Sequence, residues 1–113
     1  MTPSFHLSLP VRSIDESVDF YTRVLGARVT HRDPSGYVNL DFYGTQITLH
    51  QGDPVPLPRD FHFGVNLGIE EFERLADTLD TEVKVTDAGT ALERKKLYVR
   101  CPNGYVVEIK GYR

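Results

Sequence analysis

The sequence has a single cysteine, no tryptophan and no long apolar run. Because Cys101 has no second cysteine to pair with, an intrachain disulfide and a cysteine-rich zinc site are both excluded, which indicates a reducing compartment. A membrane span needs about 20 consecutive apolar residues, and none occur. The first residues also lack the charged start and apolar stretch of a secretory signal. We therefore expect a soluble cytoplasmic protein that does not contact a membrane.

Basic clusters are scarce too. The formal net charge is -3, and the longest basic run is Arg94-Lys95-Lys96, which we interpret as a solvated loop or strand end. This balance gives no reason to expect a nucleic acid as partner. At 113 residues, with 40% hydrophobic and 26% charged residues, the chain predicts one globular domain with a core that needs no disulfides.

A repeat organises the chain. Residues 5–11 predict a strand that carries His6, and Ser13 is a good N-cap for the amphipathic helix that follows and ends near Gly26. A second copy of this pattern begins at His62, with a strand over 61–67 and a helix from about Ile69. The copies align when counted from their histidines, with one residue fewer at the second strand-to-helix turn.

Three further strands are expected after each helix. Residues 52–60 contain three prolines and predict an extended connector between the halves. The pattern therefore predicts an α+β fold with two βαβββ modules in a single domain: module one at about 4–51 and module two at 61–113. The expected strands are 27–32, 37–42 and 46–50 in the first module, and 82–86, 97–101 and 105–110 in the second, with a break at 87–90.

The alternation of side chains along a strand predicts where the two histidines point. His6 lies on the face opposite Leu7 and Leu9, and His62 on the face opposite Phe63 and Val65. The apolar face of a two-layer module packs under its helix. Both histidines should therefore face away from the helix, toward solvent or a concavity.

Glu108 is the most informative acid. Aligning the two halves on their turn glycines places Thr48 at the position of Glu108. A carboxylate within an apolar strand must be paired, hydrogen-bonded or bound to metal if it points inward. His6, His62 and Glu108 fit a facial triad, which binds a divalent metal and leaves positions open for substrate. Three separate half-buried polar residues are the alternative, and the repeat-related histidines favour the metal.

With these features the sequence resembles the vicinal oxygen chelate superfamily, which includes glyoxalase I, extradiol dioxygenases, fosfomycin resistance transferases and bleomycin resistance proteins. The resemblance covers nearly the whole chain. It rests on the His6 strand followed by Ile14–Tyr21 and Leu25-Gly26, on the His62 strand, and on the closing segment Pro102–Glu108. It implies paired βαβββ modules whose sheets curve around a cavity where a metal chelates adjacent oxygens of the substrate.

The resemblance also implies a ligand set. The family's metal ligands fall on His6, His62 and Glu108, and glyoxalase I has a fourth ligand, a glutamate, where this chain has Thr48. The set thus favours a metal-dependent enzyme of the three-ligand kind, with Fe2+, Mn2+, Ni2+ or Zn2+ and a small-molecule substrate, most like an extradiol dioxygenase. A fosfomycin-transferase-like or glyoxalase-like enzyme stays open, as does a metal-free bleomycin-type binding protein, although the absence of tryptophan weakens a site that works by stacking alone.

Three further residues are candidates for catalysis. His50 shares a strand face with Thr48 and could act as an acid or base, or it could be an edge histidine near solvent. Ser8 is two residues from His6 on the same face. Tyr98 or Tyr105 could orient a substrate oxygen, depending on which strand face each occupies, and Tyr105 is kept as the candidate.

The resemblance, together with the open face of a single βαβββ sheet, predicts a homodimer with sites between chains. In that arrangement His6 comes from one subunit, and His62 and Glu108 come from the other.

Overall fold

The computed structural model describes residues 1–58, 60–79, 84–91 and 94–113. The chain divides into two compact units, Met1–Val55 (unit 1) and Pro56–Arg113 (unit 2). Within the described residues, no helix is both long and apolar enough to cross a lipid bilayer.

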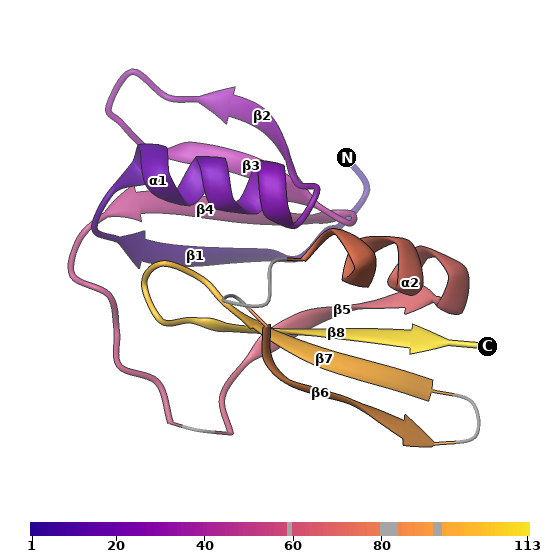
Figure 1. The fold of residues 1–113 in the computed structure, drawn as a ribbon. Helices are drawn as coiled ribbons and strands as arrows, with labels where there is room; N and C mark the ends of the chain where they lie inside the picture. Colours follow the sequence, from indigo (N-terminus) through magenta and orange to yellow (C-terminus); the bar gives the residue numbers. More distant parts are fainter. Residues whose placement is uncertain (59, 80–83, 92–93) are drawn as a thin grey trace. The chain divides into compact units, whose positions relative to one another are not determined.

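Unit 1 is one four-stranded sheet with one helical segment. The sheet order is β1-β4-β3-β2, in which β1 runs parallel to β4 and the other neighbours are antiparallel (Figure 1). Its elements are β1 (His6–Val11), α1 (Ile14–Asp19), the π-helical turn η1 (Phe20–Val24), β2 (Arg28–Arg32), β3 (Val38–Phe42) and β4 (Thr45–Gln51).

Unit 2 repeats this plan. Its sheet order is β5-β8-β7-β6, with β5 parallel to β8, so each strand has a counterpart in unit 1 (Figure 1). Its elements are β5 (Phe63–Gly68), α2 (Ile69–Thr78), β6 (Lys84–Ala91), β7 (Arg94–Arg100) and β8 (Val106–Tyr112). The predicted α+β fold with two βαβββ modules is confirmed.

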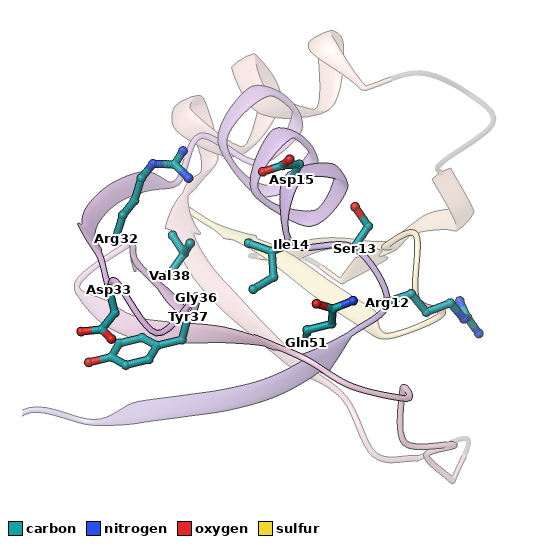
Figure 2. A pocket seen from close by; sticks show the side chains of 10 residues that line it. All are labelled: Arg12, Ser13, Ile14, Asp15, Arg32, Asp33, Gly36, Tyr37, Val38 and Gln51. Atoms are coloured by element: carbon teal, nitrogen blue, oxygen red, sulfur yellow. The ribbon is translucent and has the colours of Figure 1, made fainter.

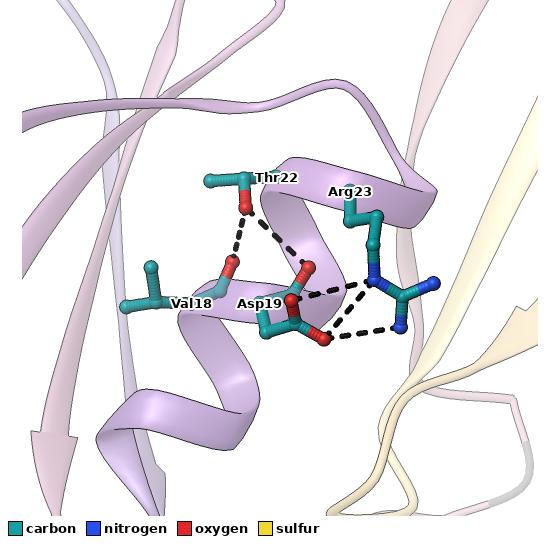
Figure 3. Close-up of polar contacts among 4 residues, drawn as sticks. All are labelled: Val18, Asp19, Thr22 and Arg23. Carbon is teal, nitrogen blue, oxygen red and sulfur yellow. Dashed lines mark hydrogen bonds and ion pairs between the residues drawn. The ribbon is translucent and has the colours of Figure 1, made fainter.

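The first helix begins and ends as its sequence predicts. The backbone N–H of Glu16 donates to Ser13 Oγ at 3.2 Å, so Ser13 is the N-cap. Near the other end, Thr22 Oγ1 donates to the carbonyl of Val18 at 2.7 Å, as Figure 3 shows. Such a bond from Thr to the preceding turn bends a helix, and here it lies where the helix widens to a π turn.

Each core is the apolar face of a sheet with the helix residues that cover it. The alternation expected for β1 is present, since Leu9 and Val11 are buried while His6 and Ser8 are exposed. The other large buried side chains of unit 1 are Val18, Phe20, Tyr21, Leu25, Val38, Leu40, Phe42, Ile47 and Leu49, and those of unit 2 are Leu67, Phe72, Leu79, Leu97, Val99, Tyr105, Val107 and Ile109. Each helical segment therefore contributes one apolar face to the core of its unit.

One strand prediction in unit 2 was wrong. We expected a break at 87–90, but β6 runs through these residues to Ala91 and pairs with β7. The register shifts twice along this pairing, between Lys84 and Thr86 and between Thr86 and Gly89. Bulges of this kind let a strand continue through residues that interrupt its alternation. Residues 82 and 83 of the predicted strand lie outside the described residues.

The basic run Arg94-Lys95-Lys96 forms the start of β7. Lys95 pairs with Glu73 of α2, with Nζ 2.7 Å from Oε1, so it points to the helix side of the sheet. Lys96 alternates to the other side, where its Nζ lies 5.9 Å from the ring centre of Tyr98. The sheet thus separates the two neighbouring lysines.

Candidate metal centre

Glu108 lies in the middle of the sheet face of unit 2 that points away from α2. It alternates with the buried Val107 and Ile109, and its register partners are Gly64 on β5 and Tyr98 on β7. Its residue exposure is only 7%. A carboxylate this covered needs partners for its charge. The structure provides three of them.

His62 and Lys110 take opposite oxygens of Glu108. His62 Nε2 lies 3.5 Å from Oε2, and Lys110 Nζ lies 3.2 Å from Oε1. Tyr98 hydrogen-bonds to the same carboxylate, and its ring meets the imidazole of His62 edge-on with centres 5.9 Å apart. The side chain of His62 is 34% exposed. Lys110 and Tyr98 therefore hold the Glu108 carboxylate in place, while the exposed part of His62 leaves the His62–Glu108 pair accessible to an ion or a substrate.

The electrostatics keep Glu108 ionised. Burial acts to raise the pKa of this carboxyl, but hydrogen bonds from Tyr98 and Lys110, with the positive charges of Lys110 and His62, outweigh burial and lower the pKa. A carboxylate that is charged at neutral pH is the form that binds a cation. Glu108 is ready for that role without losing a proton near neutrality.

Gly64 makes room for this carboxylate strand. A Cβ atom at position 64 would lie 1.9 Å from the backbone oxygen of Glu108 and 2.8 Å from its carbonyl carbon, which is far inside van der Waals contact. Any side chain here would push β5 away from β8 at the level of the proposed ligand. Gly64 was not among the predicted site residues, although it lies two residues after His62 in the sequence.

In unit 1, His6 lies beside neutral polar side chains. His6 is exposed at the start of β1, and Ser8 on the same face pairs with Thr48 of β4, just as Gly64 pairs with Glu108. The alignment of Thr48 with Glu108 is thus matched by register. Thr48 Oγ1 donates to Asn39 Oδ1 at 2.8 Å and accepts from the Gln46 amide at 3.3 Å.

The remaining predicted site residues fall in different places. His50 is exposed at the end of β4, opposite Pro10. Tyr105 is 3% exposed and alternates with Val106, so it lies on the apolar side of the sheet. Tyr98 lies on the opposite face, beside Glu108, where a tyrosine could orient a substrate oxygen. Lys110 was missed, although its spacing from Glu108 puts both on one face of β8.

A pocket of about 460 Å³ in unit 1 lies elsewhere, between the start of α1 and the β2–β3 hairpin (Figure 2). Ile14 and Val38 give it an apolar part, and Arg12 extends away from the other lining side chains. Its full lining is Arg12, Ser13, Ile14, Asp15, Arg32, Asp33, Gly36, Tyr37, Val38 and Gln51. None of the predicted site residues lines this pocket. His50 lines an adjoining pocket of about 290 Å³.

A pocket of about 300 Å³ in unit 2 is better placed. Leu57 and Pro58 of the connector line it, together with Phe61, Arg100, Gly104 and Val106. Phe61 directly precedes His62, and Val106 lies two residues before Glu108 on the same strand face. This pocket therefore adjoins the His62 end of the face that carries Glu108.

The donor set of unit 2 fits a divalent metal. Two donors that each lie roughly 2.1 Å from one ion are about 3 to 3.5 Å apart, and His62 Nε2 and Glu108 Oε2 are separated by 3.5 Å. An imidazole and a carboxylate suit iron, manganese, nickel and zinc. Over the described residues, neither unit by itself brings together three His, Cys, Asp or Glu side chains that could hold a metal. The third predicted ligand, His6, belongs to unit 1.

Residues 4–109 match the family model of the Glyoxalase/Bleomycin resistance protein/Dioxygenase superfamily. The chain belongs to this superfamily. The resemblance found in the sequence, with its His6 strand, His62 strand and closing Glu108 strand, is confirmed at the level of the family. No curated protein sequence matches significantly.

Solved structures share the fold. A glyoxalase/bleomycin resistance protein/dioxygenase from Alicyclobacillus acidocaldarius is 26% identical, with a TM-score of 0.80, covering 98% of this chain and 92% of that chain. The fosfomycin resistance protein FosX from Listeria monocytogenes is 15% identical with a TM-score of 0.83, covering 100% of this chain and 95% of that chain. Another structure of FosX contains Mn(II) and sulfate; it is 14% identical with a TM-score of 0.80, covering 100% of this chain and 92% of that chain. A possible glyoxalase from Bacillus cereus is 21% identical with a TM-score of 0.75, covering 96% and 98%.

Proposed function

We propose that the protein is a cytoplasmic, metal-dependent enzyme of the extradiol dioxygenase kind, in which His6, His62 and Glu108 bind one divalent ion. The observation that carries the proposal is the pairing of His62 with a buried, ionised Glu108. A charged side chain within an apolar strand needs an opposite charge to compensate its burial, and a bound cation would supply that charge. The neutral Thr48, where glyoxalase I has a fourth ligand, favours the three-ligand set.

The bound ion would act as a Lewis acid on adjacent substrate oxygens. The residues around it have separate tasks. Glu108 and His62 supply ligands, Lys110 and Tyr98 fix the orientation of the Glu108 carboxylate, and Gly64 leaves space for its strand.

The other predicted catalytic residues stay proposals. Ser8 and His50 are exposed on the polar face of unit 1, where Ser8 could orient a substrate oxygen and His50 could transfer a proton. For the tyrosine we favour Tyr98 over Tyr105, because the Tyr98 hydroxyl already contacts Glu108.

We propose further that the enzyme is a homodimer with shared sites. One four-stranded sheet presents an open face and cannot enclose a ligand, and His6 belongs to a different unit from His62 and Glu108. If His6 of one subunit completes the site of the other, then His6→Ala and His62→Ala proteins refolded together should regain one intact site per heterodimer. A monomer in light scattering, or no recovery of metal binding, would reject the shared site.

The proposed activity has a direct test. Protein purified without chelator or affinity tag should contain a divalent metal, and a panel of a catechol, a glyoxal adduct and an epoxide should identify the reaction, with oxygen-dependent catechol ring cleavage as the expected result. Turnover of the epoxide or the adduct alone would replace the dioxygenase assignment by a transferase or lyase.

A metal-free binding protein is the second candidate. The pocket walled by Leu57, Phe61 and Val106 favours it, since these side chains suit an apolar ligand. It would be supported by a parent protein that binds no metal and yet protects cells from bleomycin.

A further inference from the structure

Two lysines flank Glu108 on the open sheet face of unit 2. Lys96 of β7 and Lys110 of β8 are direct register partners, one step along the sheet from the pair Tyr98 and Glu108. Like charges directly opposite each other in a sheet repel and destabilise it. Lys110 is compensated, because its Nζ lies 3.2 Å from Glu108 Oε1. Lys96 instead lies over the ring of Tyr98.

This face has an excess of positive charge. Glu108 is the single acid on the strands of unit 2 among the side chains that the structure describes, whereas Lys96, Lys110 and Arg100 all lie on its face. Arg100 is occupied in part, since it donates to the carbonyl of Gly104 at 3.3 Å. A divalent ion at His62 and Glu108 would add two positive charges, which one carboxylate cannot balance.

We propose that the substrate carries an oxyanion, a carboxylate or a phosphonate, which Lys96 and Lys110 bind beside the metal. This inference rests on the proposed metal site and adds the class of substrate. The ammonium groups would give charge-assisted hydrogen bonds to the anion, and the binding would relieve the repulsion between the two lysines. Lys96 is the residue to substitute in a test, because among the described contacts it does not touch Glu108 or His62.

The experiment uses the full chain loaded with Zn2+ and two small anions, acetate and methylphosphonate, with uncharged acetamide as the control of similar size. Binding is followed by NMR through the amide shifts of β7 and β8. The variants are Lys96→Met and the matched control Lys95→Met, whose lysine lies on the opposite side of the sheet beside Glu73. Zinc affinity is measured separately for all three proteins.

We expect saturable binding of at least one anion, with the tighter of the two identifying the group, and no binding of acetamide. Lys96→Met should weaken anion binding about tenfold, while Lys95→Met should change it less than twofold and neither should change zinc affinity. Equal anion binding in all three proteins, equal loss in both variants, or saturable acetamide binding would overturn the inference and leave the metal site standing. A parent protein that binds no zinc would overturn both proposals.

Discussion

Unit 1 and unit 2 share a strand order and a register, yet they differ in charge at one central position. Thr48 pairs with Ser8 and Asn39, and Glu108 pairs with Gly64 and Tyr98 at the same two places. Thr48 satisfies its hydroxyl with neutral neighbours, whereas Glu108 needs His62 and Lys110. The difference teaches that the repeated fold sets the positions, and that a few side chains at those positions set the chemistry.

The acid nearest to His6 in the register is Asp41, and its carboxylate already has other partners. His6 pairs with Gln46, which pairs in turn with Asp41 of β3. Asp41 accepts from the backbone of Gly44 at 3.0 Å and pairs with Arg28 at 3.4 Å. In unit 1 the imidazole of His6 therefore has no available carboxylate beside it in the register, whereas unit 2 offers an imidazole and a carboxylate that contact each other.

The largest expected effect comes from Gly64→Ala. The new Cβ would lie 1.9 Å from the backbone oxygen of Glu108, so β5 and β8 must separate there. We expect a loss of about 3 kcal/mol in the free energy of unfolding, measured by urea denaturation, together with weaker metal binding.

Ser8→Ala is the matched control at the equivalent position of unit 1. Its exposed side chain already carries a Cβ, so the stability should change by less than about 0.5 kcal/mol. Equal stability of the Gly64→Ala and Ser8→Ala proteins would show that the close approach at Gly64 is not a constraint.

A smaller effect is expected where the two helices end differently. The helical segment of unit 1 ends at Val24 and is followed by Gly26, whose φ is +75°, while α2 ends at Thr78 and is followed by Leu79 in extended conformation, with φ of -77° and ψ of 134°. A Cβ at position 26 would meet only Tyr43 Oη at an ordinary 3.6 Å, so strain in the backbone dominates. Gly26→Ala should cost about 1 kcal/mol by thermal unfolding. An unchanged melting temperature would contradict the left-handed cap.

The smallest effect concerns Asp33, a half-buried acid of unit 1. Hydrogen bonds from the Ser35 hydroxyl and backbone, then from His31, hold the pKa of Asp33 well below its usual value near 3.9. A lowered pKa stabilises the folded turn above about pH 3.9, and this contribution is lost as the pH falls toward the folded pKa.

NMR titration of the Asp33 carboxyl carbon checks this. Ser35→Ala should move the midpoint up toward 3.9, because it removes the main hydrogen bond. A midpoint at the usual value in the parent protein would contradict the hydrogen-bonded Asp33 and remove it from the comparison with Glu108.

Most of the fold followed from local patterns. The cap at Ser13, the end at Gly26 and the period of the helix faces act within a few residues, so the sequence predicts them well. The continuation of β6 through Gly89 could not be predicted, because it depends on pairing with β7 and on bulges that absorb the irregular residues.

The site was predicted less completely. The repeat pointed to His62 and Glu108, which the structure pairs within unit 2. The face occupied by Tyr98, and the approach of Gly64 to Glu108, depend on register between strands that are far apart in the sequence. Tyr105 illustrates the limit, since one residue along the strand decides whether a side chain joins the core or the site.

The central claim is that unit 2 holds a metal through Glu108, whereas the equivalent Thr48 of unit 1 holds none. Calorimetric titration of Mn2+ into the apoprotein, with Glu108→Gln and Thr48→Ala as matched variants, tests it directly. We expect one ion per chain in the parent and in Thr48→Ala, and no measurable binding in Glu108→Gln although it folds like the parent. Binding by Glu108→Gln with the parent's affinity would contradict the account.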